Sequence, residues 1–270
     1  MINGRAAEKV RDRLVELIRD YTEKAGVKRI VLGVSGGKDS SVAAALSARA
    51  VGKENVYGIL LPAGTQRDIA DSEEVIRALG INGRTVNIGA AHDALKEAVL
   101  LSLSEDFFPA AVLQEEGDAA EARAALEKAE HESDINSFPR IRMTALRYIA
   151  QALGAFLCGT GNASERYVGY CTKDGDTSCD FNPLGALTSI EVVELGLTMP
   201  ELPVHLVKKT PDDGLSGIPD EVKLGVSYQA IHDVIRNGTS GDPVKDALIE
   251  RKYRASAHKR ALPPILDPFA

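Results

Sequence analysis

The sequence of 270 residues has few cysteines, no tryptophan and no excess of positive charge. Three cysteines, an odd number without a CxxC pair, argue against a disulfide framework and against a zinc site, so we expect a reduced, cytoplasmic protein. The formal net charge of −7 offers no general basic surface, and no nucleic-acid partner is expected. No apolar run approaches the roughly 18 residues that span a bilayer, and the first residues do not resemble a signal peptide, so no membrane partner is expected either.

What the sequence does contain is an alternation of short β-branched runs with amphipathic or alanine-rich segments. With 44% hydrophobic residues, a chain of this length can bury a large core. The alternation predicts a parallel sheet of five or six strands with helices on its faces, a Rossmann-like α/β fold that forms one domain over residues 1–270. The predicted strands span 29–34, 56–61, 84–88 and 155–158, and the predicted helices between them span 6–24, 40–50 and 69–79.

The second half of the chain is less regular. Residues 104–134 are rich in Ala and Glu and end in a run of charges, which predicts a surface helix or loop segment. Asn136 or Ser137 is a suitable N-cap for a helix with Pro139 in its first turn, and the apolar spacing carries that helix to about Leu153. Further short helices are predicted near 188–196, 228–236 and 242–254.

The segment with the most specific chemistry is the glycine-rich loop 33–40, which joins a predicted strand to a predicted helix. A helix N-terminus offers free N–H groups and a positive dipole end, and glycines let the backbone approach a phosphate closely. The spacing fits neither GxxxxGK[ST] nor GxGxxG. A carboxylate in such a loop is reasonable when Mg²⁺ bridges it to the phosphates. The loop residues are Gly33, Val34, Ser35, Gly36, Gly37, Lys38, Asp39 and Ser40.

This Ser-Gly-Gly-x-Asp-Ser string resembles the loop of the ATP-pyrophosphatase superfamily, whose members cleave ATP between its α and β phosphates. Later blocks resemble NAD synthetases in particular, and they occur in that family's order. The resemblance covers about residues 30 to 265 and implies an enzyme that uses ATP and ammonia to convert the carboxylate of deamido-NAD into the amide of NAD. The matching blocks are residues 136–143, 159–165, 169–176, 180–184, 220–228 and 258–260.

The resemblance also implies roles for single residues. Residues 33–40 and Thr160 would bind ATP as co-substrate, and Asp39 and Glu165 would hold Mg²⁺. Five residues would bind deamido-NAD, namely Arg140, Lys173, Asp180, His258 and Lys259. Taken alone, the basic residues among them are equally typical of solvated surface charge or of an ordinary turn, and only the joint order of the blocks along the chain favours the family roles. A homodimer is implied as well.

Two positions depart from the family pattern. Ser189 stands where relatives carry a lysine near the ATP phosphates, and Asp212 stands where they carry a hydroxyl residue. Our hypothesis is that Lys38, inside the loop, supplies part of the missing positive charge.

The rival functions are a tRNA-modifying or thiolating enzyme of the same superfamily and a nucleotide-binding sensor without catalysis. The roughly 34 residues before the loop are too few for a glutamine amidase domain, so free ammonia is expected, with a separate glutaminase as the alternative source.

Overall fold

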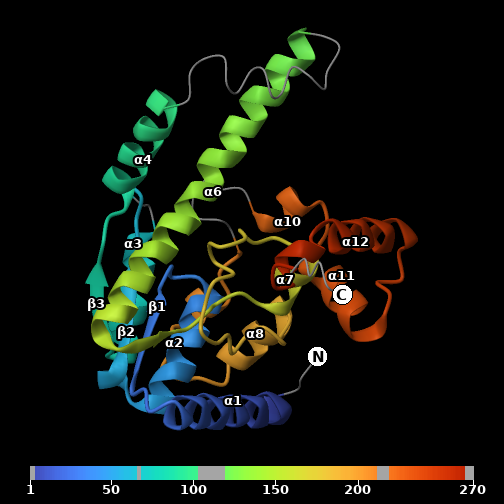
Figure 1. Cartoon of the computed structure of the whole chain (residues 1–270). Helices are drawn as coiled ribbons and strands as arrows, with labels where there is room; N and C mark the ends of the chain where they lie inside the picture. The colour runs from blue at the N-terminus through green and yellow to red at the C-terminus, as the bar shows by residue number, and fades with distance from the viewer. Residues whose placement is uncertain (1–3, 66–67, 103–118, 212–218, 265–270) are drawn as a thin grey trace, which may run out of the picture.

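A computed structural model describes residues 4–65, 68–102, 119–211 and 219–264 (Figure 1). Its centre is a four-stranded parallel sheet in the order β3-β2-β1-β4. The strands are β1 (Arg29–Gly33), β2 (Val56–Leu60), β3 (Asn82–Thr85) and β4 (Ala155–Leu157).

The strand count differs from the five or six strands that we predicted. All four described strands coincide with predicted runs, and β3 begins two residues earlier than expected. Beyond β4 the ladder shrinks to a single parallel bridge between Cys158 and Phe181. The edge of the sheet is therefore closed by the loop that follows residue 169 rather than by a further described strand.

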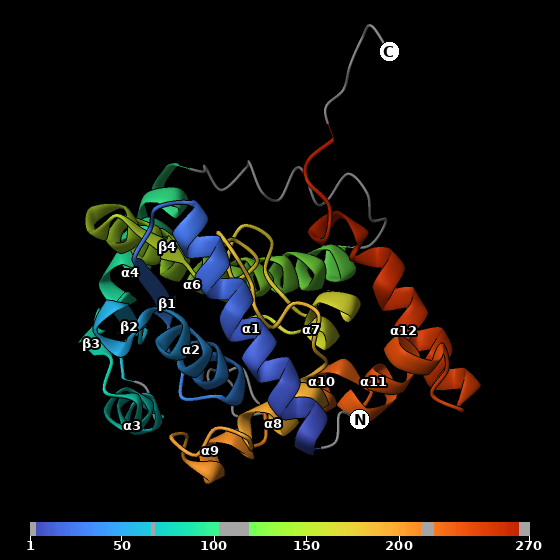
Figure 2. The same ribbon diagram turned by 90° about the horizontal axis from the view of Figure 1, so that it is seen from below.

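Helices cover both faces of the sheet, as the alternation of strands and helices requires (Figure 2). On one face, Ile30 and Leu32 of β1 pack with Leu46 and Leu195 in a core built from five helices. These helices are α1 (Gly4–Lys24), α2 (Lys38–Val51), α3 (Ile69–Leu79), α8 (Ser189–Gly196) and α9 (Val204–Val207). On the other face, Val31 and Leu157 pack against Leu146 of α6 (Ala119–Leu153).

Helix α6 begins well before the predicted N-cap at residue 136 or 137, so that prediction of the helix start was wrong. Pro139 lies inside the helix and leaves one backbone carbonyl without its usual N–H partner. Asn136 and Ser137 donate their side-chain hydrogen bonds back to the carbonyls of Glu132 (2.8 Å) and Asp134 (2.6 Å). These polar residues therefore belong to a helix interior that tolerates a proline, whereas the predicted end at Leu153 is correct.

Helix α4 (Gly89–Ser102) contacts α6 and extends away from the sheet with it (Figure 1). The described side chains from 127 to 133 are exposed, in agreement with a surface position, while residues 104–118 lie outside the described part of the chain.

A smaller cluster at the C-terminal end packs around Val168 and Ile231. It is formed by α7 (Ala163–Val168), α10 (Asp220–Leu224), α11 (Tyr228–Asn237) and α12 (Pro243–Ala255), with the 3₁₀ turn η2 (Ala257–Lys259) after it; another such turn, η1 (Lys53–Asn55), precedes β2. Within the described residues, no helix combines the length and the apolar character needed to cross a membrane.

The order of the strands places a crevice at one position. The chain runs from β1 outward through β2 to β3 and then returns to the other side of β1 as β4. Ligands of open α/β sheets bind where the strand order reverses, outside the carboxyl ends of the strands. Here that position lies between the loop after β1 and the loop after β4, which are the two loops that the sequence singles out.

Candidate active site

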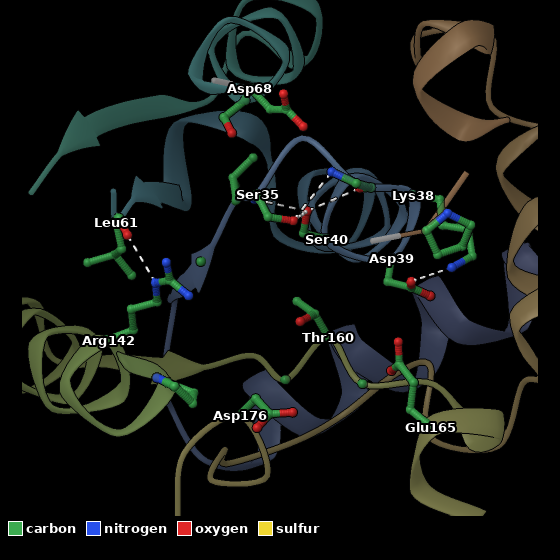
Figure 3. A pocket seen from close by; sticks show the side chains of 18 of the residues that line it. Ser35, Lys38, Asp39, Ser40, Leu61, Asp68, Arg142, Thr160, Glu165 and Asp176 are labelled. Atoms are coloured by element: carbon green, nitrogen blue, oxygen red, sulfur yellow. Dashed lines mark hydrogen bonds and ion pairs between the residues drawn. The ribbon is translucent and has the colours of Figure 1, made fainter. Parts of the chain in front are cut away.

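The loop after β1 holds an ordered turn at the start of α2. Ser40 Oγ accepts a hydrogen bond from the Ser35 amide at 3.1 Å and lies 3.2 Å from the Gly37 carbonyl, to which it donates. The two hydroxyls of Ser35 and Ser40 are 3.1 Å apart (Figure 3). Gly37 is the N-cap of α2 and no side chain caps the helix there. The positive end of α2 is thus presented to the crevice with hydroxyl donors beside it.

Gly36 is the position at which this loop requires glycine. Its φ of +79° lies in the left-handed region, and a β carbon would stand 2.6 Å from Asp71 Cβ and 2.8 Å from the Ser72 amide nitrogen. The loop backbone therefore packs directly on the first turn of α3, and any other residue would displace one of the two.

Asp39 and Glu165 face one another across the crevice (Figure 3). Asn162, fully buried, connects them: its side-chain amide donates to Asp39 Oδ1 at 3.1 Å, and its side-chain oxygen accepts from the Glu165 amide at 3.1 Å. Glu165 Oε2 in turn accepts from the Asn162 amide at 2.9 Å, which completes a capping box at the start of α7. The two carboxylates are therefore held by one local structure.

Lys38 brings a buried positive charge to the same carboxylates. Its Nζ donates to Asp39 Oδ2 at 2.7 Å, and the side chain is only 4% exposed. The ammonium also lies 5.6 Å from the centre of the Tyr228 ring. Tyr228 donates from its hydroxyl to Asp220 Oδ2 at 3.1 Å, so a third carboxylate stands behind the ring.

Burial and mutual repulsion set the protonation of this group. Burial, together with the Asp39 carboxylate, raises the pKa of Glu165 to about 8. Burial alone would lower the pKa of Lys38, but attraction to Asp39 and Glu165 outweighs it and raises the pKa above its usual value. Once Glu165 loses its proton, it and Asp39 carry more negative charge than Lys38 can balance, which favours the binding of a further cation.

A cavity of about 380 Å³ opens beside the loop, within the range of small-molecule sites. Its wall includes nearly all of the residues predicted to bind ATP and the metal, namely Gly33, Val34, Ser35, Gly37, Lys38, Asp39, Ser40, Thr160 and Glu165. Gly36 is absent from the wall and serves the contact with α3 instead.

Sequence reasoning missed several residues of this wall, and Arg142 is the most informative of them. Arg142 donates from Nε to the carbonyl of Leu61 at 3.0 Å, while the rest of its guanidinium faces the cavity (Figure 3). Burial lowers the pKa of Arg142, yet a guanidinium stays charged. Arg140, which the family resemblance favoured, lies on another side of α6. Other missed residues of the wall are Asp68, Ser72, Tyr170, Asp176, Lys209 and Asp220.

The residues that the resemblance assigned to deamido-NAD lie around the loop 169–180, outside the wall of this cavity. Arg140 donates from Nε to the Lys173 carbonyl at 3.3 Å, which brings these two predicted residues together. Lys259 Nζ donates to the carbonyls of Gly169 and Cys171 at 2.9 and 2.7 Å. His258 precedes it and is exposed.

Asp180 lies at the C-terminal end of this loop. It accepts from Arg147 Nη1 at 2.5 Å and from the Leu157 amide at 2.7 Å. These contacts anchor the loop to α6 and to β4. The loop itself reaches the cavity through Tyr170 and Asp176, so it borders the nucleotide crevice directly.

Comparison with known proteins connects this geometry to a family. Residues 10–263 match the sequence profile of NAD synthase. The chain belongs to this family. It is 34% identical over 278 residues to the NH(3)-dependent NAD(+) synthetase of Methanosarcina acetivorans, an alignment that covers 97% of this chain and 99% of the relative. The resemblance inferred from the sequence is thereby confirmed.

Solved structures of NAD synthases and related enzymes share the fold. The chain is similar to NMN synthetase from Francisella tularensis, with a TM-score of 0.80, 29% identity and coverage of 97% of this chain and 99% of the other. NAD+ synthetase from Burkholderia pseudomallei gives a TM-score of 0.71 at 29% identity, with coverage of 95% and 91%. The parallel sheet with flanking helices is therefore the ATP-pyrophosphatase fold of this family.

The two departures from the family pattern have different outcomes. Ser189 is buried at the start of α8, where its amide donates to Ser164 Oγ at 3.1 Å, and it is not part of the cavity wall. Lys38 does lie on that wall, which supports a compensating role. Asp212 lies outside the described residues.

Proposed function

We propose that this NAD synthase converts deamido-NAD into NAD with ATP and ammonia, by way of an acyl-adenylate, and releases AMP and pyrophosphate. One observation carries the proposal: Asp39 of the phosphate loop and Glu165 of α7 face one another in the wall of a cavity at the reversal point of the sheet. That arrangement suits a nucleotide whose phosphates are held by loop amides and by a metal ion.

The chemistry requires activation, because a carboxylate is a poor acyl donor. An oxygen of the nicotinate carboxylate attacks the α-phosphorus, and the bond to the β-phosphate breaks, with pyrophosphate leaving. Ammonia then attacks the carbonyl carbon of the acyl-adenylate, and AMP leaves with the bridging oxygen. Amides at the start of α2, the hydroxyls of Ser35 and Ser40 and the guanidinium of Arg142 would offset the charge that develops on the phosphates.

The donor set fits Mg²⁺. Among the described residues, no group of three or more His, Cys, Asp or Glu side chains converges on one point. Two carboxylates alone suit Mg²⁺, which keeps several waters and takes its remaining ligands from phosphate oxygens. Asp39 and Glu165 would hold the ion, and its charge would weaken the bond to the departing pyrophosphate. Lys38 would then exchange its bond with Asp39 for a phosphate oxygen.

The dinucleotide substrate would lie against the loop 169–180. Arg140, Lys173 and Lys259 place positive charge around that loop, and His258 is exposed beside it. Cations suit the phosphates and the nicotinate carboxylate of deamido-NAD. Asp180 would act by holding the loop in place through its bonds to Arg147 and to β4.

One comparison gives an alternative acceptor substrate for the same reaction. The neighbour with a TM-score of 0.80 is an NMN synthetase, and nicotinate mononucleotide carries the same carboxylate as deamido-NAD. A single assay compares the two acceptors and the two nitrogen donors. The purified enzyme is given ATP and Mg²⁺ with each acceptor, and with ammonium or glutamine, and the amide product and AMP are measured.

We expect deamido-NAD with ammonium to give the highest kcat/KM and equal amounts of NAD and AMP. Preference for the mononucleotide would replace the proposed substrate. Activity with glutamine alone would contradict ammonia as donor, and glutamine activity that needs an added amidase would identify a separate glutaminase. No AMP with either acceptor would favour a nucleotide sensor or a tRNA-directed relative.

We further propose a homodimer formed through α4 and α6. Leu95, Leu100 and Leu101 of α4 are 50%, 51% and 81% exposed, and Ile135 of α6 is 41% exposed. Apolar side chains gathered on neighbouring helices are typical of an interface.

The protein would act in the cytoplasm, where the free thiols of its three cysteines persist.

A further inference from the structure

The first turn of α3 forms part of the wall of the nucleotide cavity, beside the start of α2. Asp68, Ile69 and Ser72 all belong to the cavity wall. Gly36 packs on Asp71 and on the backbone of Ser72, so the phosphate loop and the start of α3 are in direct contact. The space beside the loop is therefore approached by the N-termini of two helices, α2 with 14 residues and α3 with 11.

Ser72 carries the strongest sign that this wall meets a ligand. Its side chain is 1% exposed, and among the described residues its hydroxyl has no hydrogen-bond partner. A buried hydroxyl without a partner lowers stability, because it has lost water and gained nothing in exchange. A serine inside a helix can bond to the carbonyl one turn earlier, as the buried Ser47 does to Ala43 at 2.8 Å. Ser72 leaves that bond unmade.

A lysine offsets part of the negative charge at this helix start. Asp68 is the N-cap residue, but its side chain does not cap the helix. Instead, Lys209 Nζ donates to Asp68 Oδ2 at 2.5 Å and to Asp71 Oδ2 at 2.8 Å. One lysine thus binds both carboxylates and offsets part of their negative charge beside the cavity.

We propose that the start of α3 is a phosphate subsite, in which the Ser72 hydroxyl donates a hydrogen bond to an oxygen of the terminal phosphates of the nucleotide. The inference rests on the proposed function, since it assigns the pyrophosphate end of ATP to this wall. Pyrophosphate is then bound both by the loop at the start of α2 and by the Ser72 hydroxyl at the start of α3. The unpaired hydroxyl of the ligand-free protein acquires its partner only when phosphate is bound.

The experiment measures pyrophosphate binding and stability separately. Binding of pyrophosphate with Mg²⁺ is followed by calorimetry, without deamido-NAD, on the full chain and on Ser72→Ala. Thermal unfolding of the ligand-free proteins is measured in parallel. Ser47→Ala is the matched control, because it removes an equally buried hydroxyl that has a partner and lies outside the cavity wall.

Ser72→Ala is expected to weaken pyrophosphate binding by about tenfold or more, the effect of one hydrogen bond to a charged group, and to raise the melting temperature of the free protein. Ser47→Ala should do the reverse, with unchanged affinity and a lower melting temperature. Unchanged affinity in Ser72→Ala would overturn the inference, as would a fall in its melting temperature equal to that of Ser47→Ala. The assay does not depend on amide formation, so normal NAD synthesis with unchanged pyrophosphate binding in Ser72→Ala would refute the subsite alone.

Discussion

Replacing Glu165 with Gln should make the metal-free protein more stable while it removes activity. The carboxylate of Glu165 is held beside Asp39 in a largely buried position. Repulsion between the two ionised carboxylates destabilises the folded protein when no cation is bound. Glutamine keeps an oxygen that can accept the hydrogen bond from the Asn162 amide, so the capping box of α7 survives the change. The variant therefore removes the charge and little else.

The magnitude follows from the pKa of Glu165, which is raised from 4.5 to about 8. An acid whose pKa is higher in the folded than in the unfolded state favours folding only while it keeps its proton. The free energy of unfolding therefore falls as pH rises above 4.5, and the loss is complete above about pH 8. A pKa shift of this size corresponds to a change of at most about 5 kcal/mol in the free energy of unfolding. Because the carboxylate is partly open to the cavity, we expect about 2 kcal/mol, or roughly 4–8 °C in melting temperature.

The assay is thermal unfolding with a chelator at pH 5 and at pH 8.5. The melting temperature of Glu165→Gln should exceed that of the unmodified protein at pH 8.5, and the difference should nearly vanish at pH 5. Adding Mg²⁺ with ATP should raise the melting temperature of the unmodified protein far more than that of the variant. NAD synthesis should fall by at least about 100-fold in the variant, the scale expected when a charged transition-state contact is lost.

Glu191 provides a control with the same local motif and the opposite electrostatics. It completes the capping box of α8, as Glu165 does for α7, but it pairs with Arg236 at 2.8 and 2.5 Å. Burial would raise the pKa of Glu191, and the bonds from Arg236 outweigh it and lower the pKa. Glu191→Gln should therefore destabilise the protein at neutral pH. If both variants destabilise, or if Mg²⁺ with ATP protects Glu165→Gln fully, the assignment of Glu165 is refuted.

Three further predictions concern the loop and the dimer. Gly36→Ala should destabilise the protein by about 2–4 kcal/mol and reduce kcat/KM, because the β carbon strikes the backbone of α3 at a positive φ; unchanged denaturant unfolding would contradict this. Lys38→Gln should raise the KM for ATP by about tenfold, and near-normal kinetics would show that Lys38 does not contact phosphate. Leu101→Glu should convert a dimer to monomer in sedimentation, whereas Val244→Glu, also exposed but on α12, should not; a monomer before mutation would contradict the proposed interface.

Local features of the site were predictable because their signals are contiguous in sequence. The run Arg29–Gly33, the glycines of the loop and the alanine-rich segment after Asp39 each specify their own backbone geometry. The end of α3 was predictable for the same reason, since Gly80 adopts the left-handed conformation that closes it. The position of the loop and the four parallel strands therefore followed from the sequence.

Long-range arrangements did not follow from local signals. A helix turns by about 100° per residue, so Arg140 and Arg142 point to different sides of α6, and only the position of the sheet decides which one meets the cavity. The start of α6 was misjudged because Asn136, Ser137 and Pro139 are as typical of a helix start as of a proline-tolerant interior. The contact between Gly36 and α3 depends on packing and has no signature in sequence.

Transfer of labelled oxygen tests the proposed chemistry most directly. Deamido-NAD with ¹⁸O in its nicotinate carboxylate is converted with ATP, Mg²⁺ and ammonium, and the products are analysed by mass spectrometry. If the carboxylate attacks the α-phosphorus of a nucleotide held by the loop at residues 33–40, each AMP carries one labelled oxygen and pyrophosphate carries none. Label in pyrophosphate or inorganic phosphate, or formation of ADP in place of AMP, would contradict the account.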